Sequence, residues 1–147
     1  VVPGVTAACG IAAATRIPLT HRDHAHSLVF VTGHLRDGTM DLDWPSLARP
    51  GQTVVVYMGF AGLPELARQL VAHGLPPSTP AAVVQDGTLP TQRVVRATLA
   101  ALPQAVAAVG LKPPTLVIVG DVVSLAETLS AVVPSAEAAT DYSLAAD

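Results

Sequence analysis

The sequence predicts an α/β fold, with a mixed parallel and antiparallel sheet of about five strands flanked by helices. Half of the 147 residues are hydrophobic and 13% are charged, which is enough apolar material for a buried core and too much for a disordered chain. Short runs of β-branched residues alternate with segments of helical propensity, as in layered α/β domains. The connections are short, so some neighbouring strands are expected to be antiparallel.

The chain is predicted to begin with a strand end, a turn and a helix. The valines at 1–2 are β-branched and run into Pro-Gly at 3–4, which is a turn pair. Thr6 can cap a helix over residues 7–15, a stretch of small helix-forming residues. Residues 16–26 are polar and contain a proline, so we expect a loop there.

The central part of the chain alternates strands with helices. SLVFVTG at 27–33 is a β-rich run with the length of a buried strand, and the turn-rich segment after it contains at most a short helix at 44–48. TVVVYMG at 53–59 predicts a second strand. In residues 63–73 the leucines fall on one helical face, and a glycine and a Pro-Pro pair then end this helix.

The last part contains three more predicted strands. Residues 81–84 begin the third strand, and residues 93–99 favour a fourth with one solvated face, because arginines flank its valines. A short helix is expected at 103–109, a strand at 115–120 and a closing helical turn at 124–129.

We expect a flexible tail over residues 131–147. From Pro134 onward the chain contains Ala, Ser, Thr and acidic residues without periodicity, a composition that buries too little apolar surface to order itself. The chain opens on Val-Val-Pro-Gly without an initiator Met, so we expect it to be a piece of a longer protein.

Composition excludes several classes of partner. Eight Lys and Arg residues and a net charge of -3 do not make the basic surface that phosphate backbones require, so no nucleic-acid partner is expected. The longest apolar runs, such as 53–58 and 115–119, are far shorter than the ~20 residues that span a bilayer, so no membrane span is expected. A single cysteine and the absence of a secretory signal pattern favour the cytoplasm.

The residues that most often carry metal or hydrolytic chemistry are not arranged for it. His21, His24 and His26 lack a known ligand spacing, so a solvated polar loop is favoured over a metal site and no metal is expected. No serine sits in a nucleophile elbow. Cys9 lies among small helix formers, where a buried inert thiol is expected.

Glycines that follow apolar strands are candidates for a ligand pocket. Gly33, Gly59 and Gly87 each end such a run, and ligands of open α/β sheets bind outside the carboxyl ends of strands. A plain turn role is the alternative for each of them. Met58 is either core filler or a thioether that packs on a ligand. Neither a GxGxxG nor a P-loop pattern is present.

Six strings in the same order resemble the tetrapyrrole methylase family and, within it, the uroporphyrinogen-III C-methyltransferases, including the methyltransferase module of siroheme synthase. The resemblance runs from Val1 to about Leu129. The strings are VVPGVTAA at 1–8, RIPLTHRDHA at 16–25, VTGHL at 31–35, VYMG at 56–59, QDGT followed by TQRVV within 85–95, and LVIVGDVV at 116–123.

This resemblance implies two α/β domains with S-adenosylmethionine and the porphyrinogen in the cleft between them, in a homodimer. Residues 1–26 would then be the end of the N-terminal methylase domain and its linker, and residues 27–130 the C-terminal domain. The family's upstream cofactor loops and its proton-transfer residues have no counterpart in this sequence. We therefore assign no catalytic residue here and expect this chain alone to be inactive.

The resemblance also implies the site residues. The family's cofactor-contacting positions fall on Thr6, Ala7, Met58 and Gly87. Arg22 is the first candidate to bind substrate carboxylates, because its THRD loop is expected to lie next to the strand-end positions that line the cleft. The other candidates are Arg16, Arg36 and Arg93.

The reaction implied is attack by a pyrrole carbon of uroporphyrinogen III on the sulfonium methyl, done twice to give precorrin-2 for siroheme or cobalamin synthesis. The alternatives are a methyltransferase for a related precorrin or porphyrinoid, and a non-catalytic binding or dimerisation fragment.

Overall fold

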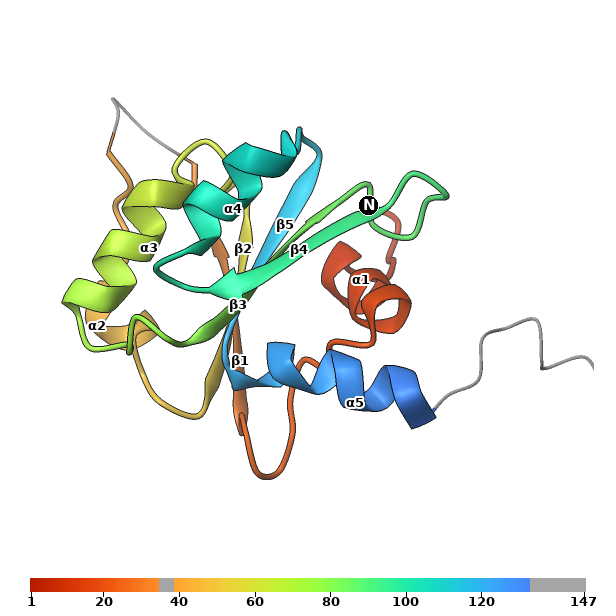
Figure 1. Cartoon of the computed structure of the whole chain (residues 1–147), viewed down its shortest axis with the longest axis horizontal. Coiled ribbons are helices and arrows are strands. Elements are labelled where there is room, and N and C mark those ends of the chain that lie inside the picture. Colours follow the sequence, from red (N-terminus) through yellow and green to blue (C-terminus); the bar gives the residue numbers. More distant parts are fainter. Residues whose placement is uncertain (35–38, 133–147) are drawn as a thin grey trace, which may run out of the picture.

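A mixed sheet of five strands organises the part of the chain that the structure describes, residues 1–34 and 39–132 of a computed structural model (Figure 1). The strand order is β1-β2-β5-β3-β4; β1 and β2 are parallel, and the other three neighbouring pairs are antiparallel. The mixed sheet predicted from the sequence is therefore confirmed. The strands are β1 (Ser27–Thr32), β2 (Gln52–Tyr57), β3 (Pro80–Gln85), β4 (Arg93–Thr98) and β5 (Thr115–Val119).

Burial along the strands follows their place in the sheet. The three inner strands, β2, β5 and β3, are continuous apolar runs because helices cover both of their faces. The edge strands β1 and β4 alternate between half-buried and exposed positions, since only one face of each is well covered. The sequence predicts one solvated face for β4, and the two arginines of this strand are exposed, as predicted.

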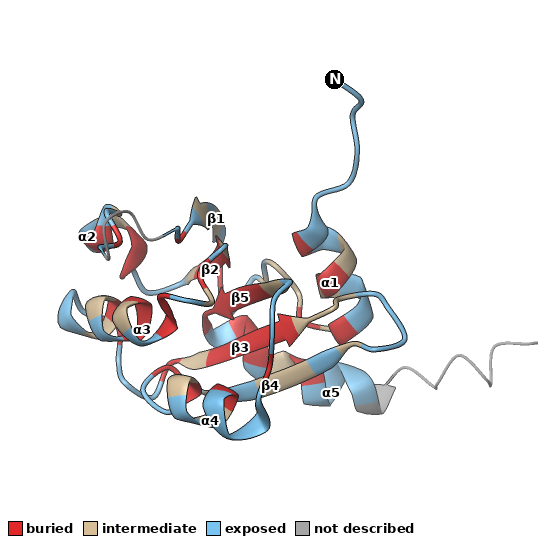
Figure 2. Ribbon diagram, turned by 90° about the horizontal axis from the view of Figure 1, so that it is seen from above, coloured by how far each residue is buried: buried red, intermediate tan, exposed pale blue. Residues whose placement is uncertain are grey.

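Helices form a layer on each side of the sheet (Figure 2). One layer packs α2, α3 and α4 against the sheet, and the other contains α1, the 3-10 turn η1 and α5. The helical segments are α1 (Ala7–Thr15), α2 (Trp44–Leu47), α3 (Leu63–Ala72), α4 (Leu102–Val109), η1 (Asp121–Ser124) and α5 (Leu125–Val132). No helix within the described residues is long and apolar enough to cross a membrane.

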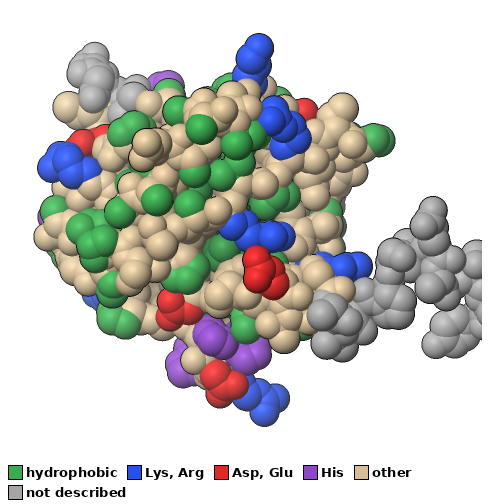
Figure 3. Space-filling view, in the orientation of Figure 1, with side chains coloured by type: hydrophobic (Ala, Val, Ile, Leu, Met, Phe, Trp, Pro, Cys, Tyr) green, Lys and Arg blue, Asp and Glu red, His purple; other side chains and the backbone are tan. Residues whose placement is uncertain are grey.

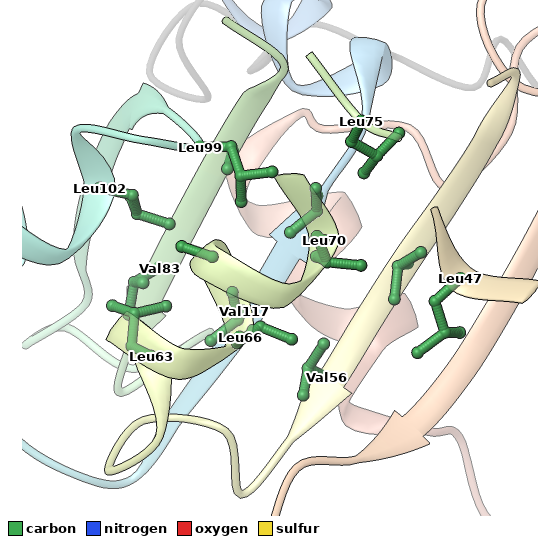
Figure 4. Packing of buried hydrophobic residues seen from close by; sticks show 14 of the residues in the cluster. Leu47, Val56, Leu63, Leu66, Leu70, Leu75, Val83, Leu99, Leu102 and Val117 are labelled. Carbon is green, nitrogen blue, oxygen red and sulfur yellow. The ribbon is translucent and has the colours of Figure 1, made fainter. Parts of the chain in front are cut away.

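The larger core lies between the sheet and α3 (Figure 4). Leu66 and Leu70 of α3 are fully buried against Val56 and Val117 of the inner strands. Each such leucine stabilises the fold by about 1.5 to 3 kcal/mol relative to an exposed one. The smaller core lies on the other face, where Ala8 and Ile11 of α1 pack with strand valines and α5.

Three expectations from the sequence need correction. Val1 and Val2 are exposed and form no strand, because no strand of the described residues pairs with them. Cys9 is exposed, because Ala8 and Ile11 occupy the buried face of α1. The closing helix α5 runs to Val132, two residues into the predicted tail. The rest of that tail, residues 133–147, lies outside the described residues.

Candidate functional site

A cavity of about 280 Å³ opens where β2 and β3 end and β5 begins, beside α1. Its lining is mostly apolar, and Asp86 is the carboxylate in it. The three segments that meet there are far apart in the sequence and are brought together by the sheet register, which pairs Tyr57 with Leu116 and Gln85 with Thr115. The lining residues are Ala7, Ile11, Tyr57, Val84, Asp86, Gly87, Leu89, Pro114, Thr115 and Leu116.

The first turn of α1 is attached to the end of β2 through Tyr57. The hydroxyls of Thr6 and Tyr57 share a hydrogen bond. The Ala8 N–H donates to the same Tyr57 oxygen at 3.2 Å. Thr6 is the N-cap residue of α1, yet its side chain makes no capping hydrogen bond within the helix. The Tyr57 hydroxyl therefore satisfies a backbone donor that an N-cap side chain usually satisfies.

The loop after β3 approaches α1 closely at Gly87. A Cβ built on Gly87 would lie 2.3 Å from Cγ1 of Ile11, a distance that real Cβ atoms essentially never show. On either side, Asp86 and Thr88 adopt left-handed backbone conformations with φ of 50° and 73°. Such conformations are rare for residues with side chains and gather at binding sites, where the surrounding structure holds them. Here the Thr88 N–H donates to Gln92 Oε1 at 2.7 Å.

Met58 directly follows Tyr57 and lies at the same edge of the sheet. Its φ is 53° and the residue is 61% exposed. It lies outside the lining of the cavity but next to it in the chain. This exposure argues against core filler, which was one of the two roles open to it from the sequence.

Thr6, Ala7, Met58 and Gly87, the cofactor positions expected from the sequence, thus lie around one edge of the sheet. Ala7 and Gly87 line the cavity. Thr6 hydrogen-bonds to Tyr57, and Met58 follows Tyr57 in the chain. These positions come from three segments that are about 30 to 80 residues apart in the chain. Their convergence is the main geometric fact about this site.

Gly33 and Gly59, the other two glycines that follow strands, are required by close packing between backbones. A Cβ on Gly33 would lie 2.7 Å from Cγ1 of Val56 and 2.9 Å from the Cα of Gly59. A Cβ on Gly59 would meet the same Val56 methyl at 2.7 Å. Neither glycine lines the cavity. The two backbones therefore need glycine in order to pass each other.

Arg22 is not where the sequence argument placed it. We expected its loop to lie next to the strand ends that form the cleft, but this loop precedes β1 and lies at the amino ends of β1 and β2, where the His26 N–H donates to the Gly51 carbonyl. This is the lower end of the sheet in Figure 1, opposite the end of β2. The length of the strands, roughly 16 to 20 Å, separates Arg22 from the cavity.

Two of the other arginine candidates donate to backbone carbonyls. Arg16 Nη1 donates to the Ser130 carbonyl at 3.4 Å, and Arg93 Nη2 donates to the Val109 carbonyl at 3.0 Å. Arg93 pairs with Gln85 in the sheet and therefore lies at the end of the sheet where the cavity opens. Arg36 lies outside the described residues.

The histidine loop is a surface feature, and histidine side chains gather at the lower edge of the molecule in Figure 3. His21 accepts from the Asp23 N–H at 3.1 Å, and its ring lies 5.0 Å from that of His24. Within residues 1–34 and 39–132, no group of three or more His, Cys, Asp or Glu side chains is arranged to hold a metal ion.

Sequence reasoning missed Tyr57 and Asp86. An aromatic residue at the end of an apolar strand suggests core, and Asp86 suggests a turn. The position of Tyr57 in its strand could have indicated its role. Tyr57 lies two residues after Val55, on the face of the sheet that α1 covers, and it directly precedes Met58.

Comparisons with known proteins agree on one family. A model of the tetrapyrrole (corrin/porphyrin) methylases matches residues 1–103. The siroheme synthase of Nitrosomonas europaea is 63% identical over 130 residues, which are 88% of this chain and 27% of that protein. The siroheme synthase of Nitrosospira multiformis is 64% identical over 88% of this chain and 28% of that protein. This chain therefore spans little more than a quarter of these relatives.

Solved structures show the same likeness. The uroporphyrin-III C-methyltransferase of Thermus thermophilus, complexed with S-adenosylhomocysteine, matches with a TM-score of 0.66 and 36% identity over 85% of this chain and 53% of that one. Its native form matches with a TM-score of 0.69 and 35% identity, over 84% and 51%. A cobalt precorrin-4 methyltransferase matches at 0.73 with 23% identity over 83% and 52%, which indicates the fold alone.

Proposed function

The chain belongs to the tetrapyrrole methylase family, and from this we propose that it is the C-terminal part of an S-adenosylmethionine-dependent uroporphyrinogen-III C-methyltransferase. The methyltransferase would be one module of a siroheme synthase. The observation that carries the proposal is that Ala7 and Gly87 line one cavity, while Thr6 and Met58 lie beside its Tyr57. The names of the relatives and structural neighbours support it.

The residues of the cavity suit this cofactor. A flat adenine ring needs an apolar slot and a close approach to backbone, and Gly87 offers bare backbone in the cavity lining. The carboxylate of Asp86 can balance the positive charge of the ligand. At about 280 Å³ the cavity is slightly below the range of roughly 300 to 1,000 Å³ typical of complete small-molecule sites. A second wall from the rest of the enzyme would complete it.

The chain's own residues would bind and orient. When bound, the cofactor supplies an electrophilic methyl group on a sulfonium, which a pyrrole carbon of the substrate attacks. Thr6 and Ala7 would hold the cofactor from α1, Gly87 from the opposite loop and the exposed Met58 side chain by packing. Correct alignment of this kind can supply about 7 to 11 kcal/mol of the barrier. Two such transfers to uroporphyrinogen III give precorrin-2.

We further propose that the intact enzyme works as a cytoplasmic homodimer. The resemblance to the family supports the dimer. The single cysteine of the sequence supports a reducing compartment.

The test is methyl transfer by the full-length protein that contains this chain. Incubated with uroporphyrinogen III and S-adenosylmethionine, it should give a product heavier by two methyl groups. Methylation of another porphyrinoid only would assign it to a different enzyme of the family, and no methylation with intact folding would favour a binding module.

A companion titration uses the 147-residue chain itself. We expect weak or no binding of S-adenosylmethionine in calorimetry, because the chain carries only one wall of the cleft. Micromolar binding would show that the cleft is complete without the upstream half.

A further inference from the structure

We propose that Tyr57 is a positioning residue, whose hydroxyl holds the first turn of α1 so that Thr6 and Ala7 lie at the edge of the cavity. This inference rests on the proposed function, because it assumes that Thr6 and Ala7 contact the cofactor. It assigns Tyr57 a role that acts through α1.

Two hydrogen bonds to one oxygen carry the argument. Thr6 and Tyr57 share one of them, and the Ala8 N–H donates the other at 3.2 Å. The partners are 51 and 49 residues apart in the chain, so these bonds are tertiary. An N-cap side chain normally fixes where a helix begins. In α1 this role falls to Tyr57, because the Thr6 side chain makes no capping bond within the helix.

Among the described residues, the contacts that hold the chain before α1 are few. The side chains of Val1, Val2 and Val5 are exposed, and a Cβ on Gly4 would meet no atom within 4 Å. The buried residues of α1, Ala8 and Ile11, fix which face of the helix meets the sheet. They do not fix the direction of Thr6, which precedes them. The Tyr57 hydroxyl does.

Tyr57 is itself well placed for this task. Its carbonyl accepts from the Gly33 N–H at 2.7 Å, and its backbone pairs with Thr32 on one side and Leu116 on the other. Its ring meets Phe30 edge-on, with centroids 6.2 Å apart. Tyr57 also lines the cavity. A hydroxyl on a fixed ring is a rigid attachment point for the first turn of α1.

The experiment compares Tyr57→Phe and Thr6→Val in the full-length enzyme. We expect Tyr57→Phe to raise the KM for S-adenosylmethionine and the Kd for S-adenosylhomocysteine about threefold to tenfold, the range of one neutral hydrogen bond. The KM for the tetrapyrrole should not change. Adding Thr6→Val to Tyr57→Phe should cost less than Thr6→Val costs in the wild type, because both changes remove the same Thr6–Tyr57 hydrogen bond.

A matched control and a second readout separate positioning from stability. Thr15→Val removes a hydroxyl from the other end of α1, where it donates to the Ile11 carbonyl at 2.7 Å, and should leave the KM for S-adenosylmethionine unchanged. Hydrogen exchange of the Ala8 amide, measured without ligand, should speed up in Tyr57→Phe.

The outcomes are distinct for the two proposals. A wild-type enzyme that does not bind S-adenosylhomocysteine contradicts the proposed function, and the Ala8 exchange then still decides whether Tyr57 holds α1. If the wild type binds and Tyr57→Phe binds equally well, the inference is wrong. Equal losses in Tyr57→Phe and Thr15→Val would also overturn it, since that pattern is general destabilisation of α1.

Discussion

Replacing Gly87 with alanine should damage both the stability of the domain and its site. The added Cβ would lie 2.3 Å from Cγ1 and 2.7 Å from Cδ1 of Ile11, and the first distance is about 1 Å short of the 3.4 Å where ordinary contact begins. Ile11 is 6% exposed and cannot swing away into solvent. Gly87 is not in the left-handed region, so the penalty comes from this contact and not from backbone strain.

The magnitude follows from how the contact can relax. Overpacking a core typically costs about 1 to 3 kcal/mol, and the midpoint of thermal unfolding falls by roughly 2 to 4 °C per kcal/mol for a domain of about 150 to 250 residues. Either α1 or the loop of Gly87 must move by about 1 Å. A displacement of that size can cost up to about 100-fold in kcat/KM.

The assay pairs thermal unfolding with methyl-transfer kinetics on Gly87→Ala, Ile11→Ala and the double variant of the full-length enzyme. Ile11→Ala alone should cost about 2 to 5 kcal/mol as a buried truncation. In the double variant the clash is gone, so its loss should be clearly smaller than the sum of the two single losses. Strict additivity, or a Gly87→Ala enzyme with wild-type midpoint and kcat/KM, would refute the reasoning.

Three further predictions concern the other candidate residues. Met58→Ala should weaken cofactor binding with little loss of stability, because the residue is 61% exposed. Truncation of a buried methionine would instead cost about 2 to 5 kcal/mol of stability. Met58→Leu, which keeps the apolar volume, should bind the cofactor better than Met58→Ala. Arg22→Ala should leave the Kd for S-adenosylhomocysteine unchanged, since Arg22 lies at the other end of the sheet from the cavity. A raised KM for the tetrapyrrole would place the substrate carboxylates at the Arg22 end. A changed Kd for the cofactor would contradict the geometry. Elemental analysis after dialysis should find no stoichiometric zinc; zinc that disappears in a His24→Ala, His26→Ala variant would make the histidine loop a metal site.

The strands were predictable because burial on both faces demands uninterrupted apolar runs. The sequences TVVVY and TLVIV are largely apolar runs typical of strands buried on both faces. The observed bounds of β2 and β5 differ from the predicted bounds by at most two residues. Val1 and Val2 have the same β propensity but no neighbour within the described residues. A strand needs a partner as well as a propensity.

The site was predictable only in part. Gly87 and Met58 stand out as residues at strand ends, whereas the importance of Tyr57 depends on a hydrogen bond across about 50 residues, which no local pattern contains. The place of Arg22 was a different kind of error. A loop that precedes a strand lies at its amino end, so the direction of the chain already excluded the cleft edge.

The order in which the strands are joined has a consequence for synthesis. β5 is the last strand in the chain among those described, yet it lies in the middle of the sheet, between β2 and β3. While a ribosome is still making residues before Thr115, β1 with β2 and β3 with β4 can only form two separate half-sheets. Each half-sheet then presents a bare valine-rich edge, Val54–Val56 on one and Val83–Val84 on the other, and such edges readily pair with other chains. Until β5 is made, this sheet therefore carries two unpaired edges that favour aggregation, and the arrival of that one strand closes both at once.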